Sequence, residues 1–215
     1  MLNFNKIKNE KLTIELFKEY TEKEQVELRE LVGRGMVKHL TKESPYSVIF
    51  TEDVYNKIDG KMSKVNEDRT IDRYIIEIKA YYTTDNQRKA DKHNEGTFMI
   101  DHEKCRYMCE DATKDNYSKK PLLIGLFSDG MYIWDLRKTD WRKNAEWRPC
   151  EKKGVKHGEK ELSFVTHLPL EQAIYVDHSI NIDYYYEHVH YNLFNEMERE
   201  QNKNTELTED DNLPF

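Results

Sequence analysis

A long amphipathic helix is predicted near the N-terminus of the chain. Between residues 22 and 41, most apolar side chains recur three and four positions apart, which places them on one face of an α-helix; they are Val26, Leu28, Leu31, Val32, Met36, Val37 and Leu40. Thr21 precedes this run and Glu24 follows three positions later. This is the pattern of a capping box, in which side chains satisfy the N–H groups at a helix start. We therefore expect a helix over 22–41.

After this helix the pattern changes to β-rich segments. Residues 46–51, 57–64 and 73–82 are strand candidates, and the last of these, RYIIEIKAYY, is the richest in β-branched and aromatic side chains. The apolar run 122–127 and the segment 131–136 flank Ser-Asp-Gly, which predicts a hairpin. These segments together predict a β-sheet.

Two more helices and one more strand complete the expected pattern. A helix is predicted over 101–114 with Asp101 as its N-cap, and another over 184–197. Between them, 162–166 is a strand candidate and 170–173 starts a short helix. Helices and strands in this order favour the α/β or α+β class, with a mixed central sheet flanked by helices. We expect a single folded domain over residues 1–197.

The charge balance separates the chain into a nearly neutral body and an acidic tail. The 215 residues include 34 Lys and Arg against 41 Asp and Glu, a formal net charge of −7. Residues 196–215 contribute −5 of this charge, whereas residues 1–195 carry only −2. An acidic chain at first argues against a nucleic-acid partner, but the body itself is not acidic enough to exclude one. We expect 198–215 to be a flexible tail.

The sequence predicts a cytoplasmic protein without a membrane partner. No apolar run reaches the roughly 20 residues that span a bilayer, and residues 1–10 lack the apolar core of a signal peptide. The three cysteines contain no CxxC pair, which fits a reducing compartment. Cys105 and Cys109 stand four positions apart on the predicted 101–114 helix, where we expect buried thiols rather than a zinc site.

Asp59, Glu77 and Lys79 are the residues whose types and spacing indicate catalysis. Glu77 and Lys79 lie two positions apart on a predicted strand, so their side chains point to the same face. Asp59 is 18 residues upstream, a distance that lets an antiparallel strand return it beside Glu77. Two carboxylates and a backbone carbonyl, for which Ile78 is placed, form an all-oxygen site suited to Mg²⁺ (or Mn²⁺). With a lysine beside it to stabilise charge on a phosphate, this site predicts metal-assisted phosphodiester hydrolysis.

At these residues the chain resembles the PD-(D/E)xK nuclease superfamily, with Asp59 as the first acid and Glu77-Ile78-Lys79 as the E-x-K motif. It looks particularly like small bacterial or phage members, in which a helix like 100–107 and a strand pair like 121–134 follow that motif. The resemblance covers about residues 22–136. It implies a restriction-endonuclease-like sheet flanked by helices and a Mg²⁺-dependent deoxyribonuclease of DNA replication, recombination or repair.

The resemblance also implies a Glu on the first helix that helps to hold metal or water. Glu30 is the first choice, because helical spacing places it with Val26 and Val37, and Glu27 is the second. The proline that the family carries before its first acid is absent here, and Asp53 competes for the role of that acid. The predicted catalytic set is Glu30, Asp59, Glu77 and Lys79, and the predicted metal ligands are Asp59, Glu77 and Ile78.

Basic residues near the motif are candidates for contacts with DNA. Phosphate contacts dominate nucleic-acid affinity, and the residues assigned to them are Lys61, Arg88, Lys89, Lys92 and Lys104. The polar segment 83–96 is expected to form a mobile loop over the site that binds DNA. Residues 138–160 mix two tryptophans with arginines and lysines. They are predicted to form an irregular basic insert, either a DNA-contacting hairpin or an ordinary loop.

The chain ends in an acidic segment followed by an apolar tip. Aspartates followed by Leu-Pro-Phe and a carboxylate form a compact recognition element, because Phe fills an apolar pocket while the charges meet a basic rim. The segment resembles the acidic tip of bacterial single-stranded-DNA-binding proteins, which recruits replication and repair enzymes. The resemblance implies docking on such proteins by Asp210, Asp211, Leu213, Pro214 and Phe215.

Two other functions are compatible with the sequence. A single-stranded-DNA-binding protein with an acidic regulatory tail would need an OB-like, all-β body, and the helix over 22–41 and the E-x-K strand argue against that body. A catalytically inactive nuclease fold could serve as an adaptor or inhibitor. The sequence leaves open whether a nuclease of this kind cuts DNA ends or interior sites.

Overall fold

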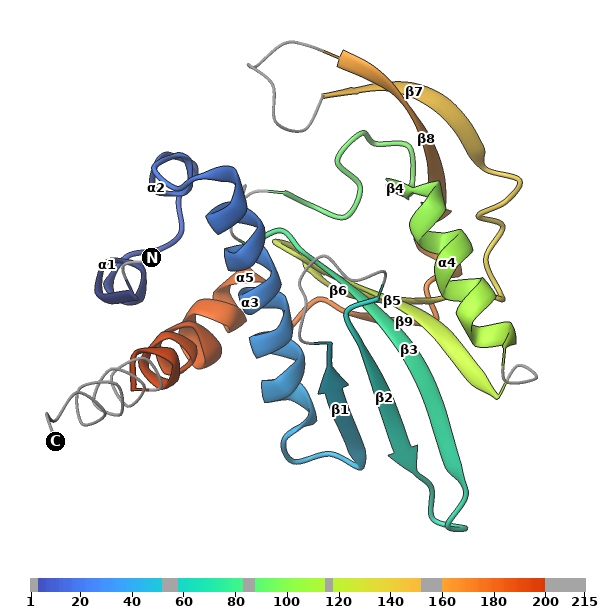
Figure 1. The fold of residues 1–215 in the computed structure, drawn as a ribbon, viewed down its shortest axis with the longest axis horizontal. Helices are drawn as coiled ribbons and strands as arrows, with labels where there is room; N and C mark the ends of the chain where they lie inside the picture. The colour runs from blue at the N-terminus through green and yellow to red at the C-terminus, as the bar shows by residue number, and fades with distance from the viewer. Residues whose placement is uncertain (1–3, 52–57, 83–87, 115–117, 152–159, 200–215) are drawn as a thin grey trace, which may run out of the picture.

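Two β-sheets with helices around them form the structure of the chain, a computed structural model that describes residues 4–51, 58–82, 88–114, 118–151 and 160–199 (Figure 1). The larger sheet, sheet A, has the strand order β1-β2-β3-β5-β6-β9, and its β3–β5 pair is parallel whereas its other pairs are antiparallel. Its strands are β1 (Tyr46–Phe50), β2 (Gly60–Val65), β3 (Ile71–Ala80), β5 (Lys119–Phe127), β6 (Gly130–Asp135) and β9 (Tyr175–Asp177).

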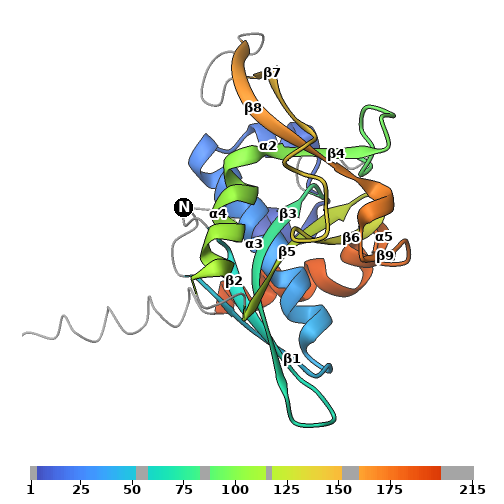
Figure 2. The ribbon, with the colours of Figure 1, turned by 90° about the vertical axis from the view of Figure 1, so that its right-hand side faces the viewer.

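The smaller sheet, sheet B, is antiparallel and has the order β4-β8-β7. Its strands are β4 (Thr97–Asp101), β7 (Ala145–Glu151) and β8 (Lys160–Pro169). Figures 1 and 2 show the β7–β8 ribbon projecting away from sheet A, beyond the N-terminal end of helix α4 (His102–Thr113).

Helices cover both faces of sheet A. They are α1 (Phe4–Asn9), α2 (Ile14–Lys18), α3 (Glu22–Thr41), α4 (His102–Thr113), a 3₁₀ turn (Leu170–Gln172) and a last helix that begins as α5 (Ile182–Tyr184), passes through a π-helical segment (Tyr185–His190) and runs on over 191–199. α1, α2, α3 and the last helix enclose one hydrophobic core with sheet A, whereas α4 and sheet B enclose a second.

Strand β3 separates these two cores, because its side chains alternate between faces. Ile76, Ile78 and Ala80 face α3, and Glu77 and Lys79 face α4. α3 approaches β3 closely at Gly33, where an added Cβ atom would lie 2.8 Å from Ile78 Cγ2. The helix backbone therefore lies directly on the strand that carries the E-x-K motif.

Side-chain caps fix the starts of α3 and α4. Thr21 and Glu24 form the reciprocal capping box that the sequence predicted, and the Asp101 side chain accepts a hydrogen bond from the Glu103 N–H at the start of α4. The predicted helix over 22–41 is confirmed with both of its ends, and the helix over 101–114 is confirmed to within one residue at each end. The thiols of Cys105 and Cys109 are buried, as expected.

The α+β class with a mixed central sheet flanked by helices is confirmed. Of the two alternatives for the insert over 138–160, the hairpin agrees with the structure, because Ala145–Glu151 forms β7 and pairs antiparallel with β8 along its whole length. The segment is therefore not irregular there, and its contact with DNA stays a prediction. Four further elements were not expected from the sequence: α1, α2, β4 and β9. Among the described residues, no helix is both long enough and apolar enough to cross a bilayer.

Candidate active site

The register of β2 against β3 brings Asp59 to Glu77. Gly60 pairs with Ile76 in the antiparallel ladder, so the residue before Gly60 stands opposite the residue after Ile76. The Asp59 N–H donates to the Ile76 carbonyl at 3.0 Å, and the Ile78 N–H donates to Asp59 Oδ2 at 2.5 Å. The predicted antiparallel pairing that places Asp59 beside Glu77 is therefore present. The Asp59 carboxylate is hydrogen-bonded to the backbone of the E-x-K strand.

Glu77 is fully buried, with 0% of its surface exposed. Its Oε1 atom accepts from Lys79 Nζ at 2.6 Å and lies 3.1 Å from Lys104 Nζ, which reaches it from α4. Its Oε2 atom is also buried and has no hydrogen-bond partner among the described residues. An unpaired buried carboxylate oxygen is costly. Glu77 therefore presents one neutralised oxygen and one oxygen that still lacks a ligand.

The charged groups of the site shift one another's pKa values. Burial, and after it the neighbouring Glu30 carboxylate, raise the pKa of Asp59 to about 6, although Lys79 and the Ile78 N–H act in the opposite direction. Burial also raises the pKa of Glu77, against the lowering effect of Lys79. For Lys79 burial lowers the pKa, but Glu77 and Asp59 outweigh it and the net pKa is raised. The lysine is therefore charged at neutral pH.

The third acid of the site is Glu30, from α3. It lies close enough to Asp59 for a hydrogen bond between the two carboxyl groups to contribute to the raised pKa of Asp59. Glu30 also pairs with Arg34, one turn further along α3, at 2.9 Å. Glu27, the second choice, lies 3.8 Å from Lys23 instead. The structure thus brings Glu30, the first choice, to Asp59.

Whether this group suits a divalent cation is decided by its oxygens. No set of three or more His, Cys, Asp and Glu side chains in the described ranges is arranged to hold an ion. The two coupled carboxylates of Asp59 and Glu77, and the buried Glu77 oxygen without a partner, are nevertheless the hard ligands that Mg²⁺ and Mn²⁺ use, together with water and backbone carbonyls such as that of Ile78. The donor set fits such an ion with two side-chain ligands rather than three.

Two arginines lie beyond the C-terminal end of β3, and the sequence predicted one of them. The Arg88 guanidinium lies 3.6 Å from the centre of the Tyr81 ring, and its Nε atom is buried without a hydrogen-bond partner in the described structure. Arg29 extends from α3 over the Phe17 ring at 5.0 Å. Burial lowers the pKa of Arg29, Tyr81 raises it, and Arg88 lowers it, which puts the two guanidinium groups within electrostatic reach of each other.

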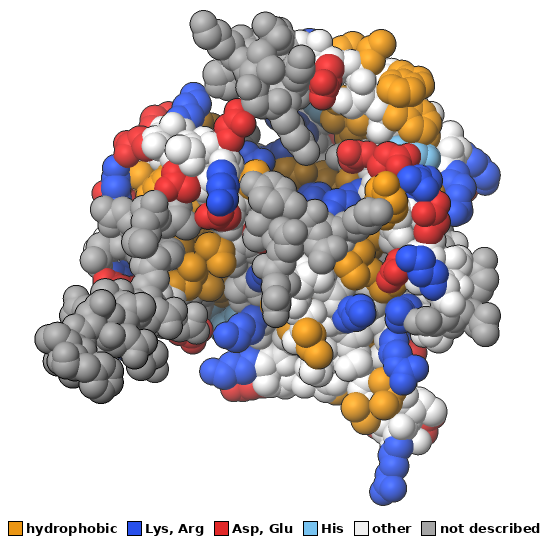
Figure 3. Space-filling model, viewed as in Figure 1, with side chains coloured by type: hydrophobic (Ala, Val, Ile, Leu, Met, Phe, Trp, Pro, Cys, Tyr) orange, Lys and Arg blue, Asp and Glu red, His pale blue; other side chains and the backbone are white. Residues whose placement is uncertain are grey.

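The other predicted DNA contacts differ in position. Lys61, Lys89 and Lys92 are exposed, whereas Lys104 is bound to Glu77 and belongs to the acidic site itself. Figure 3 shows the surface hollowed between the N-terminal helices and sheet B, with Lys and Arg side chains inside the hollow. Residues 83–87 of the expected loop lie outside the described residues, as do Asp53, 152–159 and the tip residues Asp210, Asp211, Leu213, Pro214 and Phe215.

Arg29, Arg34 and the ionic role of Lys104 were not predicted. A signal for Arg34 was present, because a Glu four positions before an Arg on a helix forms an ion pair. Arg29 and Lys104 reach the site only through the packing of α3 and α4 against β3, which is a long-range property.

Comparison with protein-family models, with curated proteins and with solved structures gives no match to this chain. The resemblance to the PD-(D/E)xK superfamily therefore depends on the residues of the site and remains a prediction.

Proposed function

We propose that the protein is a divalent-metal-dependent deoxyribonuclease of the PD-(D/E)xK type. The observation that carries the proposal is the state of Glu77: it is fully buried, held at one oxygen by two lysines, and without a partner among the described residues at the other. A carboxylate of this kind opposite a second carboxylate is poorly explained by folding alone, because burying charge without full compensation destabilises a protein. It is well explained as one side of an ion site.

In this proposal each residue of the site has a role. Asp59 and Glu77 would hold the ion together with the Ile78 carbonyl, and Lys104 would keep the Glu77 carboxylate oriented. When bound, Mg²⁺ or Mn²⁺ supplies Lewis acidity toward a phosphate oxygen and toward water. Lys79, whose side chain is 33% exposed, is accessible to substrate and stays protonated, so it stabilises negative charge on the phosphate rather than acting as a base. Glu30 orients Asp59 or a water beside it.

The first test combines cleavage with metal binding. Labelled single-stranded, duplex and branched DNA is incubated with the full chain in Mg²⁺, Mn²⁺ or EDTA, and we expect cleavage only with metal. Independently of activity, Mn²⁺ is expected to raise the Tm of the wild-type chain, because a ligand that binds only the native state stabilises it. Glu77→Gln should remove that rise.

The control is Glu103→Gln, which changes an exposed Glu on α4 that pairs with Arg106. It should keep the Mn²⁺-induced rise in Tm. If no DNA is cut but Mn²⁺ still binds through Glu77, the chain is an inactive nuclease fold acting as an adaptor or inhibitor. If neither effect is seen, the metal site is wrong.

The single-strand-binder alternative receives less support. It requires an all-β, OB-like body, whereas the chain has a 20-residue helix, α3, packed on a sheet with a parallel β3–β5 pair. We therefore retain the proposal of an enzyme that acts on DNA. We propose that it works in the cytoplasm of a bacterial cell and is encoded by the bacterium or by a phage.

For the acidic tail we propose docking on replication or repair proteins that recognise the tips of single-strand binders. Deleting Leu213–Phe215 is expected to abolish binding to such a protein while sparing DNA cleavage, since the tip is separated from the site by a polar linker. A pull-down with a purified tip-binding protein measures the effect. Deleting Gln201–Lys203, three linker residues, is the control and should leave binding intact. Equal binding by both variants contradicts the docking proposal.

A further inference from the structure

One row of side chains runs along β3 through the candidate active site. Alternate residues of a strand point to the same face, so Arg73, Ile75, Glu77 and Lys79 share the face toward α4. Ile75 and Glu77 are fully buried there, whereas Arg73 is exposed and Lys79 is partly exposed. Tyr81 extends this row by one position, because its N–H continues the ladder to the Leu126 carbonyl at 2.9 Å. At about 3.3 Å per residue, the eight steps from Arg73 to Tyr81 span about 26 Å.

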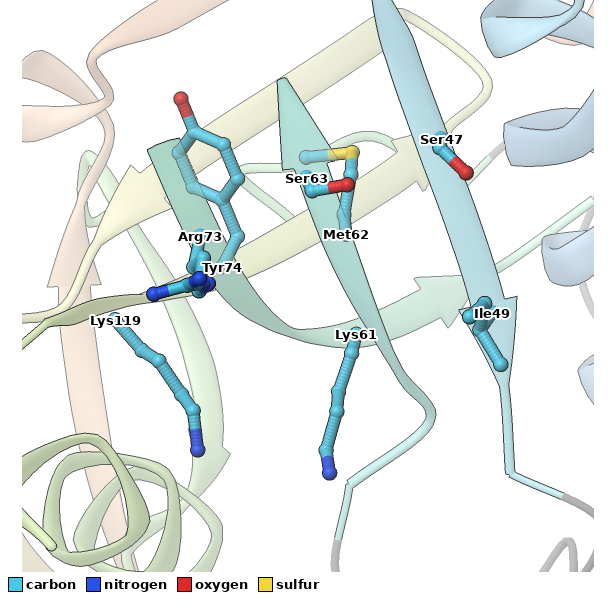
Figure 4. A pocket seen from close by; sticks show the side chains of 8 residues that line it. All are labelled: Ser47, Ile49, Lys61, Met62, Ser63, Arg73, Tyr74 and Lys119. Carbon is cyan, nitrogen blue, oxygen red and sulfur yellow. The ribbon is translucent and has the colours of Figure 1, made fainter. Parts of the chain in front are cut away.

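The end of this row nearest the start of β3 is basic. Lys61 of β2 pairs in register with Ile75, and Lys119 of β5 pairs with Arg73, so the three cations converge on one side of sheet A. They line a cavity of about 140 Å³ together with Ser47, Ile49, Met62, Ser63 and Tyr74. Figure 4 shows the Lys61 and Lys119 side chains extending from the same side of the sheet.

Two cations of this basic end, Lys61 and Arg73, have no counter-charge among the described residues. The cavity has no acidic residue in its lining. Neither Lys61 nor Arg73 makes a side-chain hydrogen bond or ion pair within the part of the chain that the structure describes. Ile49 on the same face is 74% exposed, so an apolar surface accompanies the cations. Cations beside an apolar surface suit the phosphate and base of a nucleotide.

The opposite end of the row is basic as well. Arg88 lies over Tyr81, and its buried Nε–H group lacks an acceptor in the described structure. Arg29 adds a second guanidinium from α3, and neither arginine forms an ion pair with a described residue. A buried N–H donor without an acceptor is costly. A phosphate oxygen bound there would supply the missing acceptor.

We infer that a DNA strand passes over the accessible Lys79 and reaches the basic groups at both ends of this row, so that the enzyme cuts inside a strand and needs no end. The inference rests on the proposed function. Its basis is that cations without a described counter-charge flank the acidic site on both sides: Arg73 and Lys61 on one, Arg88 and Arg29 on the other. Even at the roughly 3.4 Å rise per nucleotide of duplex DNA, the row covers several nucleotides.

The deciding experiment compares circular and linear single-stranded DNA of the same sequence with the full chain and Mn²⁺. We expect the circle to be opened at an initial rate within about threefold of the linear rate per nucleotide. A circle that stays intact while linear DNA is degraded overturns this inference and leaves the proposed nuclease standing. Failure to cut linear DNA of any kind, single-stranded, duplex or branched, overturns both.

The two ends of the row are tested by binding, in EDTA and without cleavage. Arg73→Glu and Arg88→Glu are each expected to weaken binding of a labelled 20-nucleotide single strand about tenfold and to reduce its salt dependence. The control is Lys38→Glu, a charge reversal at a 72% exposed side chain near the end of α3, which should bind like the wild type. Arg73→Gln and Arg88→Gln keep the test valid if a charge reversal impairs folding. If the Arg73 variants or the Arg88 variants bind the strand as tightly as the wild type, the inference that DNA extends past the site on both sides is overturned.

Discussion

Lys79→Ala is expected to lower metal-dependent DNA cleavage by about 10²-fold or more while the protein stays folded. The lysine is the cation of the site that combines a raised pKa with a partly exposed side chain, so its removal takes positive charge from the place where a phosphate must approach. Electrostatic groups of this kind typically contribute 10²–10³-fold to a reaction rate. Initial cleavage rates under saturating Mn²⁺ measure the effect.

The fold should tolerate this change because Glu77 keeps its second cation. Lys104 Nζ lies 3.1 Å from Glu77 Oε1, so the buried carboxylate is not left without a partner. Circular dichroism and Tm should therefore remain close to those of the wild type. Lys38→Ala is the matched control, since it removes an exposed lysine with no contact to the site. A Lys79→Ala variant that cuts at the wild-type rate would show that the charge of this lysine plays no part in catalysis.

Asp59→Asn is expected to make the metal-free protein more stable at pH 7 by about 1–3 kcal/mol and to abolish cleavage. Burial and the Glu30 carboxylate raise the pKa of Asp59 from 3.8 to about 6, so the ionised group destabilises the native state above that pH. At about 1.4 kcal/mol for one pKa unit, the limit of this effect is about 3 kcal/mol. Asparagine keeps an acceptor for the Ile78 N–H and can donate to Glu30. Urea unfolding in EDTA measures the gain.

The pH dependence of this gain has a definite sign. Below about pH 3.8 Asp59 is protonated in the folded and unfolded states, so the substitution should change nothing. As the pH rises through about 6, the unfolded state releases its proton first, the wild type loses stability, and the advantage of the variant grows to its full value. Asp68→Asn is the control, because the pKa of Asp68 is shifted in the opposite direction to that of Asp59. Thr70 hydrogen bonds lower the pKa of Asp68, so its replacement should not stabilise the protein at pH 7. An advantage of Asp59→Asn that persists below pH 3.8 would contradict this origin.

Local signals were sufficient to predict the elements that carry the site. The capping box of Thr21 and Glu24 sets the start of α3, and the β-branched run around Glu77 identifies β3 because both patterns act within a few residues. The return of Asp59 to Glu77 also followed from sequence, since the intervening segment is short enough for an antiparallel pair.

Elements that depend on distant partners were missed. β7 contains Pro149 and several charged residues and has little strand character of its own, and it becomes a strand because β8 offers a complete pairing edge. β4 likewise pairs with β8, whose partner residues stand 64 to 72 positions later in the chain. For the same reason the sequence placed Lys104 near the motif only along the chain and did not indicate Arg29 at all. It could not show that Lys104 neutralises Glu77 or that Arg29 stands beside Arg88.

The close approach of α3 to β3 at Gly33 and Ile78 affects the carboxyl groups of the site as well as the packing of the core. α3 carries Glu30 and Arg29 about one turn before Gly33, and Ile78 lies between Glu77 and Lys79 of β3. The absence of a side chain at position 33 therefore sets the depth at which Glu30 meets Asp59. Any larger residue there would act as a spacer between helix and strand, separate the two carboxyl groups, and retune the acidity of Asp59 without altering a single charged residue.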